Sequence, residues 1–171
     1  MRAAVAAIVA AFAAAVCATI PAYAFTGRVV GIADGDTLTV MHEQRPVRVR
    51  LFGIDAPEHG QPFASRARES LSELAHGRDA DVDERGRDTY GRVLGRVRVA
   101  GVDVNAEQVR RGYAWVFRRY TRDPVLLALE DDARAARRGL WRDAAPVAPW
   151  TWRVDHPNIA RPGVPDAAIA Q

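Results

Sequence analysis

A strict alternation of apolar and charged residues at 47–51 is the feature that most restricts how this chain can fold. The run reads Val-Arg-Val-Arg-Leu and follows Pro46. A period of two is typical of a β-strand that has one face buried and the other in water. Arg48 and Arg50 should therefore lie on the same side of this strand.

The rest of the chain predicts a small barrel with helices. Short β-prone runs at 27–32 and 37–41 flank an Asp-Gly turn, and 79–99 contains two more strands around a turn at 87–92. Three segments show helical spacing between start and stop signals: Pro62 to Gly77, Asp103 or Asn105 to Gly112, and Asp123 to Gly139. Five strands with three helices predict an α+β fold, a partly open five-stranded barrel. The OB-fold is one candidate among several.

The first 24 residues have the features of a secretory signal peptide. Met1-Arg2 precedes a small, apolar run at 3–20, and Ala22-Tyr23-Ala24 fits a signal peptidase site. A membrane anchor is the alternative, because the run is just long enough to span a bilayer. The run is rich in alanine, however, and alanine favours membrane insertion only weakly. We expect a protein that is exported to the periplasm or secreted, with no membrane attachment after cleavage.

Composition narrows the possible sites. Cys17 is the only cysteine and would leave with the signal, so disulfides and thiolate metal sites are excluded from the mature chain. All 24 basic residues are arginine, yet the net charge is only +3. This charge is too small to indicate nucleic-acid binding by itself.

Three acidic residues follow predicted strand ends or turns. Asp36 lies at the start of the second strand, and Asp55 and Glu58 follow the third. Oxygen ligands without histidine or cysteine suit a hard cation such as calcium. The alternative is that these residues only stabilise turns, where aspartate is common.

Two arginines could bind a phosphate group. Arg50 lies five residues before Asp55, and Arg92 follows a Tyr-Gly turn. A guanidinium group is planar and can donate to two phosphate oxygens at once. The alternative is that both arginines cover a solvated strand face, as charged residues usually do.

Taken together, the motifs resemble the staphylococcal nuclease (thermonuclease) family. The matches are DGDT at 34–37, RLFGIDAPE at 50–58, DTYGR at 88–92, VNAEQVRRGYAWV at 104–116, GLW at 139–141 and PWTWR at 149–153. Each motif is weak alone, but their order and spacing are specific. The resemblance covers 27–153 and implies an OB-fold nuclease domain at 25–153, followed by a loose tail at 154–171.

The resemblance implies a calcium-dependent hydrolysis that leaves 3′-phosphate ends on DNA or RNA. Asp36, Asp55 and the carbonyl of Ala56 would bind Ca²⁺, and Glu58 would act as general base. Arg50 and Arg92 would stabilise the transition state at the scissile phosphate.

Substrate contacts are implied for Tyr90 and Tyr120, and Arg118 is a further candidate. Arg118 and Thr89 depart from the family pattern, which has tyrosine and lysine there, so the preference for substrate ends stays open. Basic and aromatic residues alternate at 110–122, where we expect the arginines and Tyr120 to contact nucleic acid and the other aromatic residues to pack. The acidic run 130–132 should be a solvated helix face.

Two other classes of function remain open. One is a catalytically silent OB-fold module that binds nucleic acid or a protein, although all five proposed catalytic and ligand side chains are retained. The other is a calcium-dependent envelope protein. For the nuclease we expect a monomer without a stable protein partner, acting preferentially on single strands.

Overall fold

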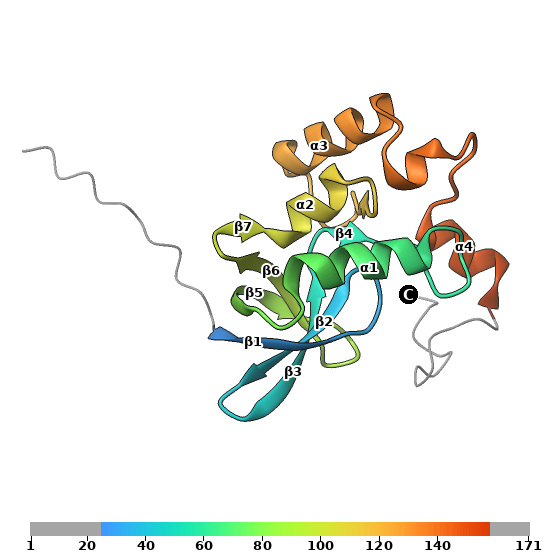
Figure 1. Ribbon diagram of the computed structural model, residues 1–171. Coiled ribbons are helices and arrows are strands. Elements are labelled where there is room, and N and C mark those ends of the chain that lie inside the picture. The colour runs from blue at the N-terminus through green and yellow to red at the C-terminus, as the bar shows by residue number, and fades with distance from the viewer. Residues whose placement is uncertain (1–24, 158–171) are drawn as a thin grey trace, which may run out of the picture.

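Five strands form a closed barrel in the computed structural model, which describes residues 25–157 (Figure 1). They are β1 (Phe25–Ile32), β2 (Thr37–His42), β3 (Arg45–Leu51), β5 (Asp79–Arg87) and β6 (Val93–Val99). The predicted signal at 1–24 and the segment 158–171 lie outside the described residues.

Closure of the barrel depends on one parallel pairing. The strand order is β3-β2-β1-β5-β6, and β3 also pairs with β6, where Arg50 is opposite Leu94 and Leu51 is opposite Gly95. The five-stranded α+β fold is confirmed, and the ring is closed rather than partly open. Register shifts in β1 and β5 mark β-bulges, which increase strand curvature and help a short sheet to close.

Valine and leucine side chains fill the barrel interior, and Gly95 makes room for two of them. A Cβ atom at Gly95 would lie 2.9 Å from the side chains of both Val49 and Val82. Both valines are fully buried. The glycine therefore lets β6 approach the neighbouring strands closely.

The three predicted helices are present. They are α1 (Ala64–Ala75), α2 (Val104–Arg110) and α3 (Pro124–Ala135). Asp123 caps α3 and Pro124 begins it, as predicted. Of the two candidate caps for α2, Asp103 is the cap, since its side chain accepts from Ala106 N at 3.0 Å.

The start of α1 differs from the prediction. The helix begins at Ala64, two residues after Pro62, because Phe63 has a left-handed backbone with φ of 68°. A non-glycine residue in that conformation cannot continue a helix, so it sets the boundary.

Several short elements were not predicted. They are β4 (Ile54–Asp55), β7 (Val102–Asp103), β8 (Trp115–Val116), the 3₁₀ helix η1 (Gly139–Arg142) and α4 (Pro149–Asp155). The predicted start of the tail at 154 falls inside α4. Trp150 of α4 packs on Trp115 and Phe117, with ring centroids 5.7 and 5.3 Å apart. This contact holds α4 against β8 and the residue that follows it.

The prediction of a solvated acidic face on α3 is wrong for Glu130. Its side chain is fully buried and accepts from Val116 N at 2.9 Å. Arg118 also pairs with it, at 2.7 Å. A helical period predicts only its pair with Arg134, four residues on, at 3.6 Å, and not Val116 and Arg118, which are more than ten residues away in sequence.

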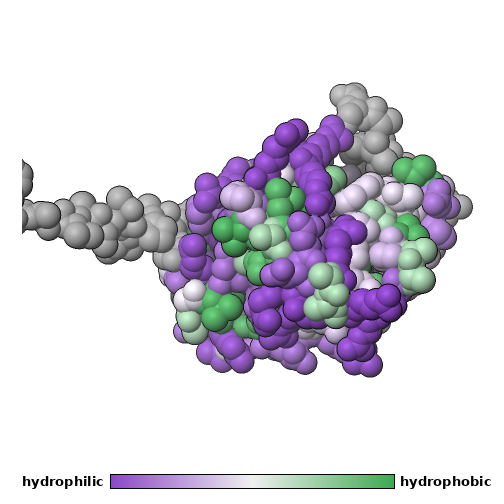
Figure 2. Space-filling model, turned by 90° about the horizontal axis from the view of Figure 1, so that it is seen from above, coloured by the Kyte–Doolittle hydropathy of each residue, from purple (hydrophilic) through white to green (hydrophobic). Residues whose placement is uncertain are grey.

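One face of the molecule is largely hydrophilic. Figure 2, which views the molecule from above, shows polar residues over most of that face, with smaller apolar groups between them. No helix within 25–157 combines the length and apolar character required to cross a membrane.

Gln108 of α2 connects two other parts of the structure. Its amide nitrogen donates to Gly35 O at 2.7 Å and to Ala67 O at 3.0 Å, and its oxygen accepts from Ser70 Oγ at 2.6 Å. Gln108 is fully buried. It therefore fixes the turn before β2 against α1 and α2.

We predict that Gln108→Leu lowers the free energy of unfolding by about 2–4 kcal/mol, because two buried carbonyl groups lose their donor. Urea denaturation measures this loss. Ser70→Ala removes only one of the three hydrogen bonds and should cost less. A loss for Gln108→Leu below about 0.5 kcal/mol, the size of an ordinary surface effect, would contradict the role given to Gln108.

Candidate active site

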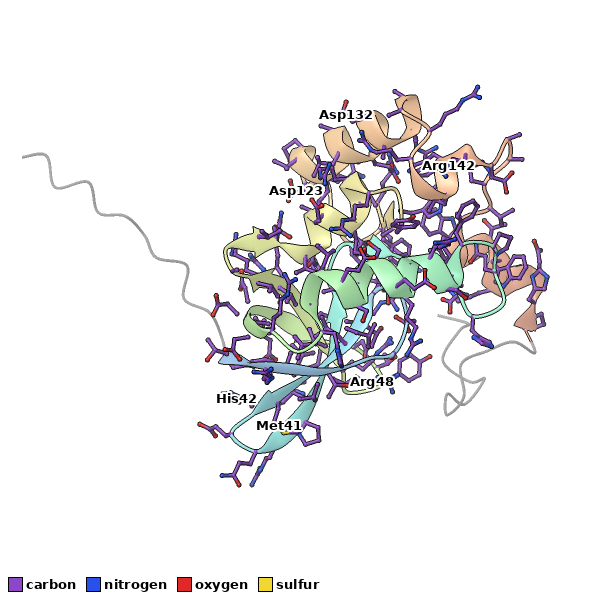
Figure 3. The ribbon with its side chains drawn as sticks, in the orientation of Figure 1. Met41, His42, Arg48, Asp123, Asp132 and Arg142 are labelled. Carbon is purple, nitrogen blue, oxygen red and sulfur yellow. The ribbon has the colours of Figure 1, made fainter. Side chains whose placement is uncertain are left out.

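The candidate site lies where three strand ends meet at one rim of the barrel. Asp36 directly precedes β2, Arg50 lies near the end of β3, and Asp55 ends β4. The backbone joins two of these segments, since Leu51 N donates to Asp36 O at 2.8 Å. Figure 3 labels Met41 and His42 at the opposite, hairpin end of β2, and exposed Arg48 on β3.

Arg50 bridges the two aspartates. One terminal nitrogen donates to Asp36 Oδ1 at 3.1 Å and the other to Asp55 Oδ1 at 2.6 Å. All three residues are at most 9% exposed. The alternative of a solvated strand face is therefore wrong for Arg50. Burial works against its charge, but the neighbouring carboxylates raise the pKa of Arg50 above its ordinary value.

Asp34 makes a contact typical of a turn, whereas Asp36 makes contacts beyond its own turn. Asp34 Oδ1 accepts from Asp36 N at 3.0 Å, which is a typical turn contact. Asp36 instead accepts from Thr37 Oγ1 at 3.0 Å, from Arg50, and from Ala56 N at 2.9 Å. Its carboxylate thus gathers groups from three segments.

Asp55 is a fully buried carboxylate. Burial raises its pKa above the ordinary value of 3.8, against the opposing effect of Arg50 and Arg153. The charge of Asp36 adds to the increase. Two like charges side by side at low exposure are stable only when cations lie close to them.

Glu58 lies in the loop that leads to α1, and its side chain is 12% exposed. Its backbone N–H donates to Gln61 Oε1 at 2.9 Å, and Gln61 Nε2 donates to Val147 O at 2.7 Å. This loop lies beside the segment that enters α4, as Figure 1 also shows. The position of Glu58 therefore depends on the C-terminal part of the chain.

Arg153 of α4 is a site residue that the sequence analysis missed. Its guanidinium group donates to Asp55 Oδ2 at 2.8 Å and pairs with Glu58 Oε1. It lies 98 residues from Asp55 in sequence. The only signal was its place in the PWTWR motif, which carries no information on where the side chain lies.

The side chain of Arg92 contacts residues of its own turn at 88–92. Its Nε donates to Asp88 Oδ2 at 2.6 Å, and its guanidinium carbon lies 5.5 Å from the centre of the Tyr90 ring. Register still relates it to the site. Arg92 directly precedes β6, whose first residue Val93 is opposite Val49 on β3, so its backbone lies near the end of β3 that carries Arg50.

The three predicted substrate contacts differ in their surroundings. Tyr90 is 39% and Tyr120 57% exposed, so both aromatic rings are accessible. Tyr120 packs edge-on against Phe117, with centroids 5.0 Å apart. Arg118 is half exposed, but its guanidinium group pairs with buried Glu130 on α3.

The donor atoms fit a hard divalent cation. Asp36 and Asp55 present carboxylate oxygens around one guanidinium group, and the backbone of Ala56 lies beside both. Within 25–157, no three side chains of His, Cys, Asp or Glu gather in a ready metal site. A cation here would thus depend on two carboxylates and a carbonyl or waters, which is compatible with weak calcium binding.

Comparison with known proteins finds a matching family model and relatives that are named as nucleases. A family model described as "Staphylococcal nuclease homologue" matches residues 48–143. An uncharacterized endonuclease of Escherichia coli is 47% identical over 128 residues, which are 74% of this chain and 84% of that protein. A micrococcal nuclease of Shigella flexneri is 42% identical over 147 residues, 79% of this chain and 84% of that protein. The family match includes Arg50, Asp55, Glu58 and Arg92, whereas Asp36 and Arg153 lie outside it.

We predict a pH trend from the raised pKa of Asp55. A raised pKa in the folded state means that protonation favours folding, so this contribution is lost as the pH rises above about 3.8. Asparagine does not titrate. The stability of Asp55→Asn relative to the natural protein should therefore increase from about pH 4 to pH 7, with chelator present. Urea denaturation at several pH values measures it, and a decrease over that range would contradict the assignment.

Proposed function

The chain belongs to the staphylococcal nuclease family and is a nuclease, and we propose that it hydrolyses phosphodiester bonds of DNA and RNA with the help of calcium. The observation that carries the proposal is the bridge from Arg50 to Asp36 and Asp55, with Glu58 joined to Asp55 through Arg153. One rim of the barrel thus carries a guanidinium group, two potential metal ligands and a candidate base.

Calcium is the cation that the donor set favours. Asp36, Asp55 and the carbonyl of Ala56 offer only oxygen, which is the donor atom that calcium prefers. A bound divalent cation supplies charge neutralisation for the phosphate and lowers the pKa of a nearby water. Asp36 and Asp55 would hold it, with waters completing the shell.

Glu58 is the proposed general base. Its carboxylate is mostly buried but keeps some access to water, and it lies beside Asp55 through their common partner Arg153. In that position it can accept the proton of an attacking water or orient that water.

Arg50 and Arg92 are proposed to stabilise the charge that develops on the phosphate oxygens. Arg50 is preorganised by two carboxylates and does not need to move far to meet an anion at the rim. Arg92 directly precedes β6, next to the end of β3, and we assign it the departing 5′-oxygen, so that the products carry 3′-phosphate ends. Its pair with Asp88 would orient the guanidinium group.

The exposed rings of Tyr90 and Tyr120 are proposed to contact the neighbouring nucleotide and its terminal phosphate. Stacking on aromatic rings suits unpaired bases, which favours single strands. Arg118 holds α3 through Glu130, so we give it a smaller part in substrate binding. We further propose export through the signal at 1–24, and action as a monomer in the periplasm or outside the cell.

A catalytically silent binding module is the alternative. Such a module has no need to connect Asp36, Arg50, Asp55 and Glu58 through a chain of ion pairs, since buried ion pairs are costly to assemble. Their preservation as a connected set favours the enzyme. A calcium-dependent envelope protein without a nucleic-acid role has no feature in its support.

We predict that the purified protein cleaves denatured DNA and RNA with millimolar calcium and not with a calcium chelator, because the two carboxylates need the cation to hold a phosphate. Gel electrophoresis of a labelled oligonucleotide measures this. Equal cleavage with the chelator would refute the metal role. Products without a 3′-phosphate would refute the assigned direction of cleavage.

We predict that Glu58→Gln and Arg92→Ala each lower kcat at least about a hundredfold, the scale of losing one well-placed catalytic group. Initial rates with saturating calcium measure the loss. Glu69→Gln and Arg142→Ala serve as controls, since both residues are exposed. A variant with the natural rate would remove its residue from the mechanism.

A further inference from the structure

Arg153 brings a second cationic group, after Arg50, into contact with the candidate metal ligand Asp55 from a part of the chain outside the barrel. It belongs to α4, which begins at Pro149, whereas the other site residues come from the barrel and its loops. Trp150 packs on Phe117 with the rings nearly parallel, at 10°. Arg153 follows Trp150 by three residues, so both lie on the same side of the helix. The tryptophan contact therefore directs Arg153 toward the rim.

The guanidinium group of Arg153 occupies the side of Asp55 that Arg50 leaves open. Arg50 donates to Oδ1 of Asp55, while Arg153 donates to Oδ2 at 2.8 Å and more weakly to Oδ1 at 3.3 Å. Both carboxylate oxygens of Asp55 thus have arginine donors. A cation that binds Asp55 must share these oxygens with Arg153 or displace it.

The two arginines differ in how firmly they are held. The side chain of Arg50 is 11% exposed and that of Arg153 is 29% exposed. Arg50 is also fixed by strand pairing on both sides of β3. Arg153 is on a short terminal helix and has a long side chain that can turn toward water. It is the guanidinium group that can leave Asp55 at lower cost.

The charges of the site also favour competition between Arg153 and a divalent cation for Asp55. Asp36, Asp55 and Glu58 carry three negative charges, and Arg50 and Arg153 carry two positive charges. Removal of Arg153 leaves the site more negative and takes one arginine donor away from Asp55 and Glu58. Both changes strengthen the attraction for a divalent cation.

We propose that Arg153 is an internal counter-cation that competes with calcium for Asp55 and so sets the calcium affinity of the site. It keeps Asp55 and Glu58 together when calcium is low, and it yields Asp55 as the cation binds. Arg153 is in this sense a positioning residue that acts on the ligand and the base. The inference rests on the proposed function, which supplies the identity of the cation.

Isothermal titration of calcium into the purified protein tests the proposal without measuring catalysis. Arg153→Gln removes the charge and should lower the calcium Kd about tenfold or more, the scale on which one nearby charge shifts an equilibrium. Arg153→Lys keeps the charge and should stay within about threefold of the natural protein. Arg142→Gln is the matched control: this arginine is exposed on η1 (Figure 3) and should leave the Kd unchanged.

The outcomes separate the inference from the proposed function. If the natural protein binds calcium and Arg153→Gln binds it with the same or a weaker affinity, the inference is wrong and the proposed function stands. If the natural protein does not bind millimolar calcium at all, both are wrong. Arg153→Met replaces Arg153→Gln if circular dichroism shows that the glutamine variant is unfolded, and the same two results apply to it.

Discussion

The bridge that Arg50 makes between Asp36 and Asp55 is the interaction on which the site depends. Two carboxylates of very low exposure cannot stay ionised side by side unless a cation lies between them. The barrel provides that cation through geometry. β3 pairs with β2 on one side and β6 on the other, which fixes the backbone of Arg50 at the rim. Loss of one partner from such a buried pair typically costs about 3–5 kcal/mol, so fold and site are coupled.

The C-terminal helix extends this arrangement. α4 looks peripheral in Figure 1, yet Trp150 packs on Trp115 of β8 and Arg153 reaches Asp55 and Glu58. Gln61 connects the Glu58 loop to the segment that enters this helix. The candidate base is therefore positioned by residues near 147–153 as much as by the barrel.

Local sequence signals predicted much of the fold for clear physical reasons. The alternation at 47–51 identified β3, and Asp123 with Pro124 identified the start of α3, because both signals are properties of a few adjacent residues. The predicted start of α1 was wrong because the left-handed backbone of Phe63 has no signature in the sequence. Glu130 was misjudged because a charged residue on a helix is usually exposed, and its two closest partners, Val116 and Arg118, lie on another segment.

Within the site, sequence and resemblance identified Asp36, Arg50, Asp55 and Glu58, which the structure brings together. Neither could show that Arg50 is buried. An alternation of apolar and charged residues defines two faces of a strand, but it does not indicate what covers the polar face. Arg153 was not identifiable as a site residue, since its contacts span 95 and 98 residues. Such contacts follow from tertiary packing and not from any local pattern.

A crystal structure with calcium and a non-hydrolysable oligonucleotide would test the central claim most directly. The account predicts one calcium ion at about 2.3–2.6 Å from carboxylate oxygens of both Asp36 and Asp55, with a phosphate beside Arg50 and Arg153 turned away from Asp55. An ion bound elsewhere, with the bridge from Arg50 and Arg153 to Asp55 intact beneath the nucleic acid, would contradict it.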